Sequence, residues 1–153
     1  MAFDVANAVT AIEEAAGWRP TAPDADGVWH YFLEDGLDLN VFSPDGRVCV
    51  FDADLGSLPD AGPARDEELV RIGRLVAASF KTRASILSVH NGRLQLHRTV
   101  NLQTASERRI VAQAQDFLND QAWWRRNLNA NVAASSSSAF SFPSGWFPGQ
   151  MTF

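Results

Sequence analysis

An Asn-Gly pair at residues 91–92 is the feature that most constrains the fold of this chain. It lies in the stretch "SVHNGRLQLHRTV", between two runs in which apolar and polar residues alternate. Both positions of a two-residue hairpin turn need a positive φ angle, which Asn and Gly tolerate better than other residues. The stretch therefore predicts an antiparallel hairpin. Its apolar face consists of two facing pairs, Val89 with Leu94 and Leu87 with Leu96.

The other face of this hairpin carries His90, Arg93, Gln95 and His97. The two histidines are about four rungs apart, or about 13 Å at a rise of about 3.3 Å per residue. Two ligands of one zinc ion must lie much closer, because Zn–N bonds are about 2 Å long. We therefore expect no metal site here, and we interpret this face as a solvated polar surface over a buried apolar one.

The N-terminal third of the chain predicts one helix followed by three strands. Over residues 4–16 apolar residues recur at spacings of three and four, which is typical of an amphipathic helix. The turn signals Asp35-Gly36 and "SPDG" then separate three strand-like runs. Strands joined by tight turns form an antiparallel meander. The predicted strands span residues 28–34, 37–42 and 47–55.

Two further helices are predicted around the hairpin. Residues 64–82 have acidic residues near the positive end of a helix and basic residues near its negative end. Ser106 is a suitable N-cap for a final helix that extends to about residue 128. The order α-βββ-α-ββ-α predicts an α+β domain over residues 1–128, with an antiparallel twisted sheet packed by helices.

Composition excludes several classes of protein. The net charge of −5 argues against nucleic-acid binding, which needs a basic surface. No apolar run is long enough to cross a membrane, and the acidic N-terminus around Asp4 is not typical of a signal peptide. The single cysteine, Cys49, can form no disulfide within the chain, which fits the cytoplasm. No glycine-rich phosphate-binding motif is present, so we expect no cofactor.

A few residues are candidates for chemistry. Cys49 lies between two valines of a predicted strand, where a small structural residue is common. His30 faces Val41 in the predicted register, which favours a half-buried histidine over a ligand. Asp52 and Asp54 can hold a divalent cation, yet aspartates are also common at strand ends before a turn. We predict no enzymatic activity, and a small enzyme or ligand-binding domain using these residues is the alternative.

The predicted meander has apolar residues on both faces. A sheet packed on one side should be polar on the other, so a second apolar face is typical of an interaction site. A covering helix is the alternative explanation. The predicted core face holds Phe32, Leu39, Val41, Val48 and Val50. The second face holds Trp29, Tyr31, Leu33, Phe42, Cys49 and Phe51.

The helix predicted over residues 64–82 also has two apolar stripes. One stripe can pack on the sheet, and the other contains small residues that let a partner helix approach closely. We therefore predict a symmetric homodimer through this helix, with burial inside one domain as the alternative. The first stripe holds Leu69, Ile72, Val76 and Phe80, and the second holds Val70, Gly73 and Ala77.

Four stretches together suggest a family. They are the helix "FDVANAVTAIEEAAG", the meander "LDLNVFSPDGRVCVFDADLGSLP", the hairpin "ILSVHNGRLQLHRTVNL" and the final helix "DFLNDQAWWRRNL". In this order they resemble the class I type III secretion chaperones, the Tir-chaperone (CesT-like) family, over about residues 3–128.

The resemblance implies a dimeric bacterial chaperone of the cytoplasm. Such proteins bind the N-terminal region of a secreted effector in extended form and deliver it to the secretion apparatus, without hydrolysing ATP. The secretion ATPase stays open as a further partner. The implied effector contacts are Val5, Val9, Ile12, Trp29, Tyr31, Leu33, Phe42 and Phe51. The implied dimer contacts are Leu69, Val70, Gly73, Val76 and Ala77.

The composition changes sharply near the C-terminus. Residues 129–153 are uncharged and rich in Ser, Gly and Pro, which predicts a flexible segment. Its aromatic residues suggest that it fills the effector groove of its own chain or of a neighbouring copy. An inert end, or a docking peptide for another secretion component, is an equally open alternative. The aromatic residues are Phe140, Phe142, Trp146, Phe147 and Phe153.

Overall fold

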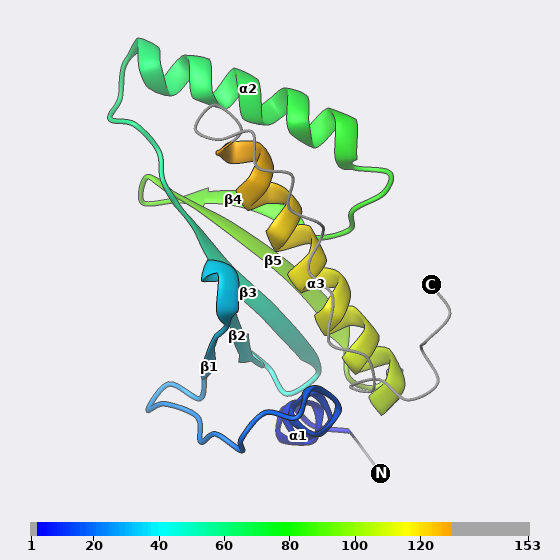
Figure 1. The fold of residues 1–153 in the computed structure, drawn as a ribbon. Helices are drawn as coiled ribbons and strands as arrows, with labels where there is room; N and C mark the ends of the chain where they lie inside the picture. The colour runs from blue at the N-terminus through cyan, green and yellow to red at the C-terminus, as the bar shows by residue number, and fades with distance from the viewer. Residues whose placement is uncertain (1–2, 130–153) are drawn as a thin grey trace.

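The computed structural model describes residues 3–129, which form one sheet and three α-helices (Figure 1). The strand order is β1-β2-β3-β5-β4, and every neighbouring pair is antiparallel. The predicted α+β fold is therefore confirmed. In chain order the elements are α1 (Val5–Ala16), β1 (Trp29–Phe32), the 3-10 turn η1 (Glu34–Gly36), β2 (Asp38–Phe42), β3 (Val48–Ser57), α2 (Pro63–Ser79), β4 (Ile86–His90), β5 (Arg93–Asn101) and α3 (Glu107–Leu128).

Helices α1 and α3 pack against one face of the sheet. Figure 1 shows α3 crossing this face, with α1 at one end of the molecule and α2 at the other. Phe51 of β3 contacts Phe117 of α3 at a ring-centroid distance of 6.0 Å, and both side chains are fully buried. Burying one such side chain contributes about 1.5–3 kcal/mol relative to leaving it exposed.

A buried glutamine fixes the position of α3 on the sheet. Gln121 donates a hydrogen bond to the carbonyl of Asp38 at 2.6 Å and accepts one from the Asp38 N–H at 3.0 Å. The side-chain amide therefore pairs with both backbone groups of Asp38 in β2, as a residue of a neighbouring strand would. Because buried amides without partners are costly, this pairing selects one position of α3 over β2.

The predicted hairpin is confirmed in its register. Val89 pairs with Leu94 and Leu87 with Leu96. Asn91 and Gly92 form the turn with φ angles of 50° and 74°. These are the positive values that a two-residue hairpin turn requires.

The predicted registers of the meander are wrong. Phe32 pairs with Asp38 instead of Leu39, and η1 occupies the five-residue connection between them, so the register differs by one residue and His30 faces Asn40 rather than Val41. In the next pair Phe42 faces Val50, whereas a four-residue turn would place Arg47 there. Both differences are odd numbers of residues, and an odd shift moves a side chain to the opposite face.

The two predicted faces are therefore mixed in the structure. Phe32, predicted to lie in the core, is 87% exposed, and Val48 and Val50 are half-buried on the same side. The side chains that α1 and α3 bury on the sheet come from both predicted sets. They are Tyr31, Leu39, Val41, Cys49, Phe51 and Ala53.

Two phenylalanines of the sheet test this assignment of faces. Phe51→Ala should lower the free energy of unfolding by about 3–5 kcal/mol, because it leaves a cavity under α3. Phe32→Ala should change it by no more than about 0.5 kcal/mol, because the ring is exposed. Urea unfolding at a fixed protein concentration measures both. Equal losses for the two variants would contradict the assignment.

Candidate protein-binding surfaces

The face of the sheet opposite α1 and α3 is the first candidate surface, and we call it the open face. Its side chains follow from the strand pairings, since alternate residues of each strand point to opposite sides. Phe42 and Val50 form one cross-strand pair on it, and Phe32 lies at its edge on β1. The apolar side chains of the open face are Phe32, Phe42, Val48, Val50 and Ile86, all partly or largely exposed.

A row of polar side chains crosses the open face between these apolar groups. His30 pairs with Asn40, Asn40 with Asp52, and Asp52 with His97. The two ring nitrogens of His30 lie 2.7 Å from oxygens of Asn40 and Asp24. Burial raises the pKa of Asp52. The surface is therefore amphipathic rather than uniformly apolar.

Hydrogen bonds hold the loop before β1 against that strand. The buried carboxylate of Glu13 accepts hydrogen bonds from the Tyr31 hydroxyl and from the Thr21 N–H, each at 2.8 Å. The indole of Trp29 donates to the Thr21 carbonyl at 3.1 Å. Burial of the Tyr31 side chain is the main cause that raises its pKa, and the hydrogen bond to Glu13 is the second. The loop thus fixes the position of β1, the edge strand of the sheet on this side.

The second candidate surface lies on α2 and β4, and we call it the α2–β4 surface. Its large apolar side chains are 40–65% exposed. Ile72 is buried, and Arg71 donates hydrogen bonds at 2.9 Å to the carbonyls of Asn127 and Leu128, so that α2 is anchored to the end of α3. The exposed side chains are Leu69, Val70, Val76, Phe80, Ile86 and Val89.

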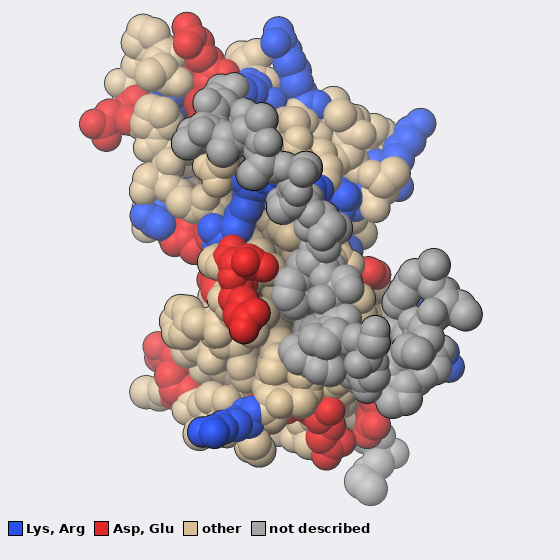
Figure 2. All heavy atoms as spheres, viewed as in Figure 1, with Lys and Arg blue, Asp and Glu red and all other residues tan. Residues whose placement is uncertain are grey.

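In the view of Figure 2, acidic and basic side chains are spread over both the half that contains α2 and the half that contains α1, with uncharged surface between them. No helix within residues 3–129 is long and apolar enough to cross a membrane.

Half of the predicted effector contacts are buried in this structure. Val9, Ile12, Tyr31 and Phe51 are buried in the core, so their side chains are not available on the folded surface. For the two sheet residues, this burial follows from the meander register, which differs from the predicted one. The two helical residues face α3 and the sheet. Helical periodicity shows that they share one face of α1, but it does not show whether that face is buried in the core or lines a groove.

The remaining predicted contacts do not share one face. Val5, Trp29 and Leu33 are half-buried at the margin of the core, whereas Phe42 lies on the open face. The most exposed apolar residue of this region, Phe32, was placed in the core by the sequence pattern. Only the register of β1 shows that Phe32 is exposed, and the local sequence does not specify that register.

The predicted dimer contacts all lie on α2 and are exposed. Leu69, Val70 and Val76 are exposed, as are Gly73 and Ala77 one turn apart. A Cβ atom added at Gly73 would meet no other atom within 4 Å. This stretch of α2 therefore has room for a second helix.

The residues of the alternative, a small enzyme, are not brought together. Cys49 is fully buried on the helix-covered face, and burial raises its pKa to about 12, so the thiol does not ionise near neutral pH. His30 lies on the opposite face. Asp54 is bound by Arg93 at 2.6 Å. Among residues 3–129 no three acidic, His or Cys side chains are grouped to hold a metal ion.

Comparison with known proteins identifies the family. Residues 7–125 match the Tir chaperone protein (CesT) family. This chain belongs to the Tir chaperone protein (CesT) family. The predicted resemblance is thus confirmed, and no curated protein sequence matches the chain closely.

Solved structures similar to this Tir chaperone family member share its fold. A chain of the ExsC–ExsE complex has a TM-score of 0.58 at 16% identity, covering 82% of this chain and 96% of that chain. A chain of the heterodimeric ExoU–SpcU complex from the type III secretion system of Pseudomonas aeruginosa has a TM-score of 0.57 at 16% identity, covering 78% and 98%. A chain of the HopA1–SchA chaperone–effector complex has a TM-score of 0.54 at 11% identity, covering 77% and 92%.

The contacts of His30 predict its titration. Both ring nitrogens face oxygen acceptors, so the hydrogen bond to Asp24, and then that to Asn40, raises the pKa of His30 above its ordinary value. NMR titration should give a value above about 6.5. The stabilisation by this pair is fully present below that pH and is lost as the pH rises through the raised pKa.

Two neighbouring aspartates provide the variant and its control. Asp24→Asn should return the pKa of His30 toward its ordinary value, because it removes the carboxylate 2.7 Å from Nε2. Asp26→Asn removes the same charge two residues away and should leave the shift in place. Identical titrations in wild type and Asp24→Asn would contradict the pairing.

Proposed function

We propose that this chain is a type III secretion chaperone that binds the N-terminal region of a secreted effector in extended form. The observation that carries the proposal is a partly apolar open face beside an edge strand, in a member of a chaperone family. The work of such a protein is binding, without catalysis or a cofactor. Its place is the bacterial cytoplasm, where it holds the effector before delivery to the secretion apparatus.

The edge position of β1 supports binding by strand addition. An edge strand presents N–H and C=O groups that a second extended chain can pair with. Main-chain hydrogen bonds give affinity whatever the side chains are, and neighbouring pockets give specificity. Phe32, on β1 itself, is 87% exposed and lies where an added strand would contact it.

The spread of the apolar groups favours a long client segment over a compact one. Four residues of β2 separate the rung of Phe32 from that of Phe42, or about 13 Å along the strand. The polar row lies between them. A segment that orders on binding loses conformational entropy, so it needs contacts distributed over a large area. Val5, Trp29 and Leu33 at the core margin extend that area beyond the open face.

We also propose that two copies associate through α2. Three exposed apolar side chains of α2, Leu69, Val70 and Val76, lie within two turns of Gly73, and exposed apolar patches are typical of protein interfaces. Gly73 and Ala77 allow the backbones of two helices to approach closely. A two-fold axis across α2 would bring the same residues of both copies together.

The effector test uses the chain itself as bait. Purified from its native bacterium, the full chain should retain a secreted protein, and a peptide from the N-terminal region of that protein should bind it directly. Phe32→Asp should weaken this binding at least about tenfold, or about 1.4 kcal/mol, because it places a charge against an apolar contact.

Gln103→Asp is the matched control, since this exposed residue lies outside both candidate surfaces. It should leave the affinity unchanged. Equal affinity of wild type and Phe32→Asp would contradict binding at β1, and retention of a folded domain instead of an N-terminal segment would contradict the proposed function.

The dimer test uses the space at Gly73. Light scattering of the wild type should give about twice the chain mass of 16.8 kDa. Gly73→Glu should give a folded monomer, because the side chain fits on one copy but buries a charge between two. Gly73→Ala is the control and should remain a dimer. A wild type that stays monomeric at high concentration, or a dimeric Gly73→Glu, would contradict the interface.

A further inference from the structure

A buried ion cluster joins α3 to the connection between α2 and β4. Asp120 of α3 is 4% exposed, and its carboxylate accepts hydrogen bonds from three donors. One oxygen lies 3.1 Å from the guanidinium of Arg83. The other accepts from Arg98 at 3.0 Å and from the N–H of Ser85 at 3.1 Å. Because charge-assisted hydrogen bonds are strong and directional, their convergence on one carboxylate fixes the positions of all three donors.

The cluster is better suited to hold segments in one position than to stabilise the fold. Arg98 is 7% exposed, and it also donates to the hydroxyl of Ser85 at 3.1 Å and to Gln113 at 2.9 Å. The cost of removing such charges from water is comparable to their mutual attraction, so the cluster adds little net stability. Any other arrangement of the segments, however, would leave a buried charge without a partner, which is costly.

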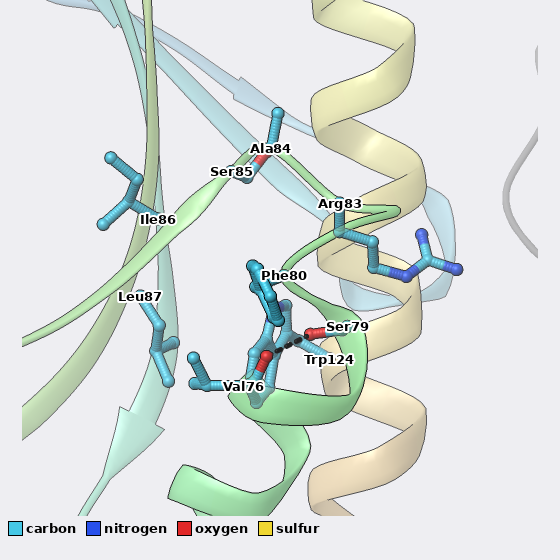
Figure 3. A pocket seen from close by; sticks show the side chains of 9 residues that line it. All are labelled: Val76, Ser79, Phe80, Arg83, Ala84, Ser85, Ile86, Leu87 and Trp124. Atoms are coloured by element: carbon cyan, nitrogen blue, oxygen red, sulfur yellow. Dashed lines mark hydrogen bonds between the residues drawn. The ribbon is translucent and has the colours of Figure 1, made fainter.

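The segment held by the cluster is the short connection between α2 and β4. Arg83 and Ser85 lie between Ser79, the last residue of α2, and Ile86, the first residue of β4. The N–H of Arg83 donates to the carbonyl of Ser79 at 2.9 Å, so a tight turn directly follows the helix. Figure 3 shows the side chain of Arg83 leaving this connection toward α3. The carboxylate on α3 therefore fixes both the end of α2 and the start of β4.

A second polar anchor joins α2 to α3 further along both helices. Arg71 donates at 2.9 Å to the carbonyls of Asn127 and Leu128 at the end of α3. Along α2, Ser79 follows Arg71 by eight residues, or about 12 Å. Along α3, Asn127 follows Asp120 by seven residues, or about 10.5 Å. Two anchors at similar separations on both helices fix the angle of α2 as well as its position.

Apolar burial contributes less to the orientation of α2. Of its seventeen residues, all within the described part of the chain, Ile72 and Ser79 are buried, and Leu75 packs partly against the core. A helix held by so few apolar contacts can tilt about them. The polar anchors at its two ends are therefore the contacts that select one orientation.

We propose that Arg83 is a positioning residue for the association of two copies. Held by Asp120, it sets the angle at which α2 and β4 meet the second copy. This role rests on the proposed dimer through α2. In a two-fold interface the same elements meet from both sides, so a tilt of α2 in one copy is repeated in the other. Helices that meet through small residues such as Gly73 approach closely, and close-packed interfaces tolerate little displacement.

The contacts of Arg83 suit this role. Its guanidinium lies over the ring of Trp123, 5.0 Å from the ring centroid, while it also pairs with Asp120. A planar guanidinium can stack on a ring and donate within its plane at once, which a lysine ammonium cannot. Arg83 can also be replaced without leaving the carboxylate unpaired, because Arg98 and the N–H of Ser85 remain bound to it.

The cluster and both anchors lie within residues 71–128. The predicted flexible segment at the C-terminus, residues 129–153, lies outside the described part of the chain from residue 130 onward. Its predicted place in the effector groove therefore stays a prediction.

The first test compares the dissociation of the dimer in two arginine variants of the full chain. Arg83→Met should raise the dissociation constant at least about tenfold in sedimentation equilibrium, because α2 loses one of its two anchors. Methionine keeps an apolar side chain of similar length beside Trp123. Arg108→Met removes the same charge from an exposed position of α3 and should leave the dissociation constant unchanged.

The outcomes separate this role from the dimer itself. A dimeric wild type with the same dissociation constant as Arg83→Met would overturn the positioning role and leave the dimer in place. A wild type that stays monomeric at high concentration would overturn the dimer and the positioning role together.

The second test separates positioning from a general loss of stability. Phe51→Ala weakens the core away from α2, so it should leave the dissociation constant within about twofold of the wild type although it destabilises the fold more than Arg83→Met does. In the Gly73→Glu background, where the second copy is absent, adding Arg83→Met should speed hydrogen exchange of residues 79–85 at least about threefold and leave β1 unchanged. Unchanged exchange there, or a dissociation constant that rises equally in Phe51→Ala, would contradict the positioning role.

Discussion

The burial of a single face of the sheet under α1 and α3 is the interaction on which the rest of the structure depends. Strand residues alternate between two sides, so covering one side with both helices leaves the other available. Gln121 ties α3 to the backbone of β2 and so fixes which residues are covered. The open face, with Phe32 and Phe42 exposed on it, is a direct consequence.

The same arrangement explains the exposure of α2. Because α1 and α3 occupy the covered face, α2 lies at the end of the molecule, where Ile72 and Leu75 pack against the core and Arg71 binds the end of α3. One apolar stripe of α2 is then partly buried against the core, and the other is exposed on the surface. This provides a surface for a second copy.

The sequence predicted features that depend on local geometry and failed where distant contacts decide. The hairpin register follows from Asn91 and Gly92 alone, and the stripes of α2 follow from helical periodicity. The turn before β3 is different. Asp45 accepts hydrogen bonds from the N–H groups of Arg47 and Val48, and the pairing with β2 begins only at Val50. In the connection before β2, Asp35 adopts a φ of 61° within η1.

These two connections determined the candidate effector contacts. A register shift by an odd number exchanges the faces, so Phe51 became a core residue and Phe32 a surface residue. The dimer candidates needed no such information, because they lie on one helix. Neither the alternation of the strands nor their turn residues could have specified the meander without knowledge of α3.

Hydrogen exchange of the chain with and without the N-terminal segment of its captured effector tests the central claim most directly. The account predicts slower exchange in β1, which carries Phe32, and in β2, which carries Phe42, with little change inside α3. Protection confined to α3 or to the loops before α2 would contradict binding at the open face, as would a complex that forms with no change in β1.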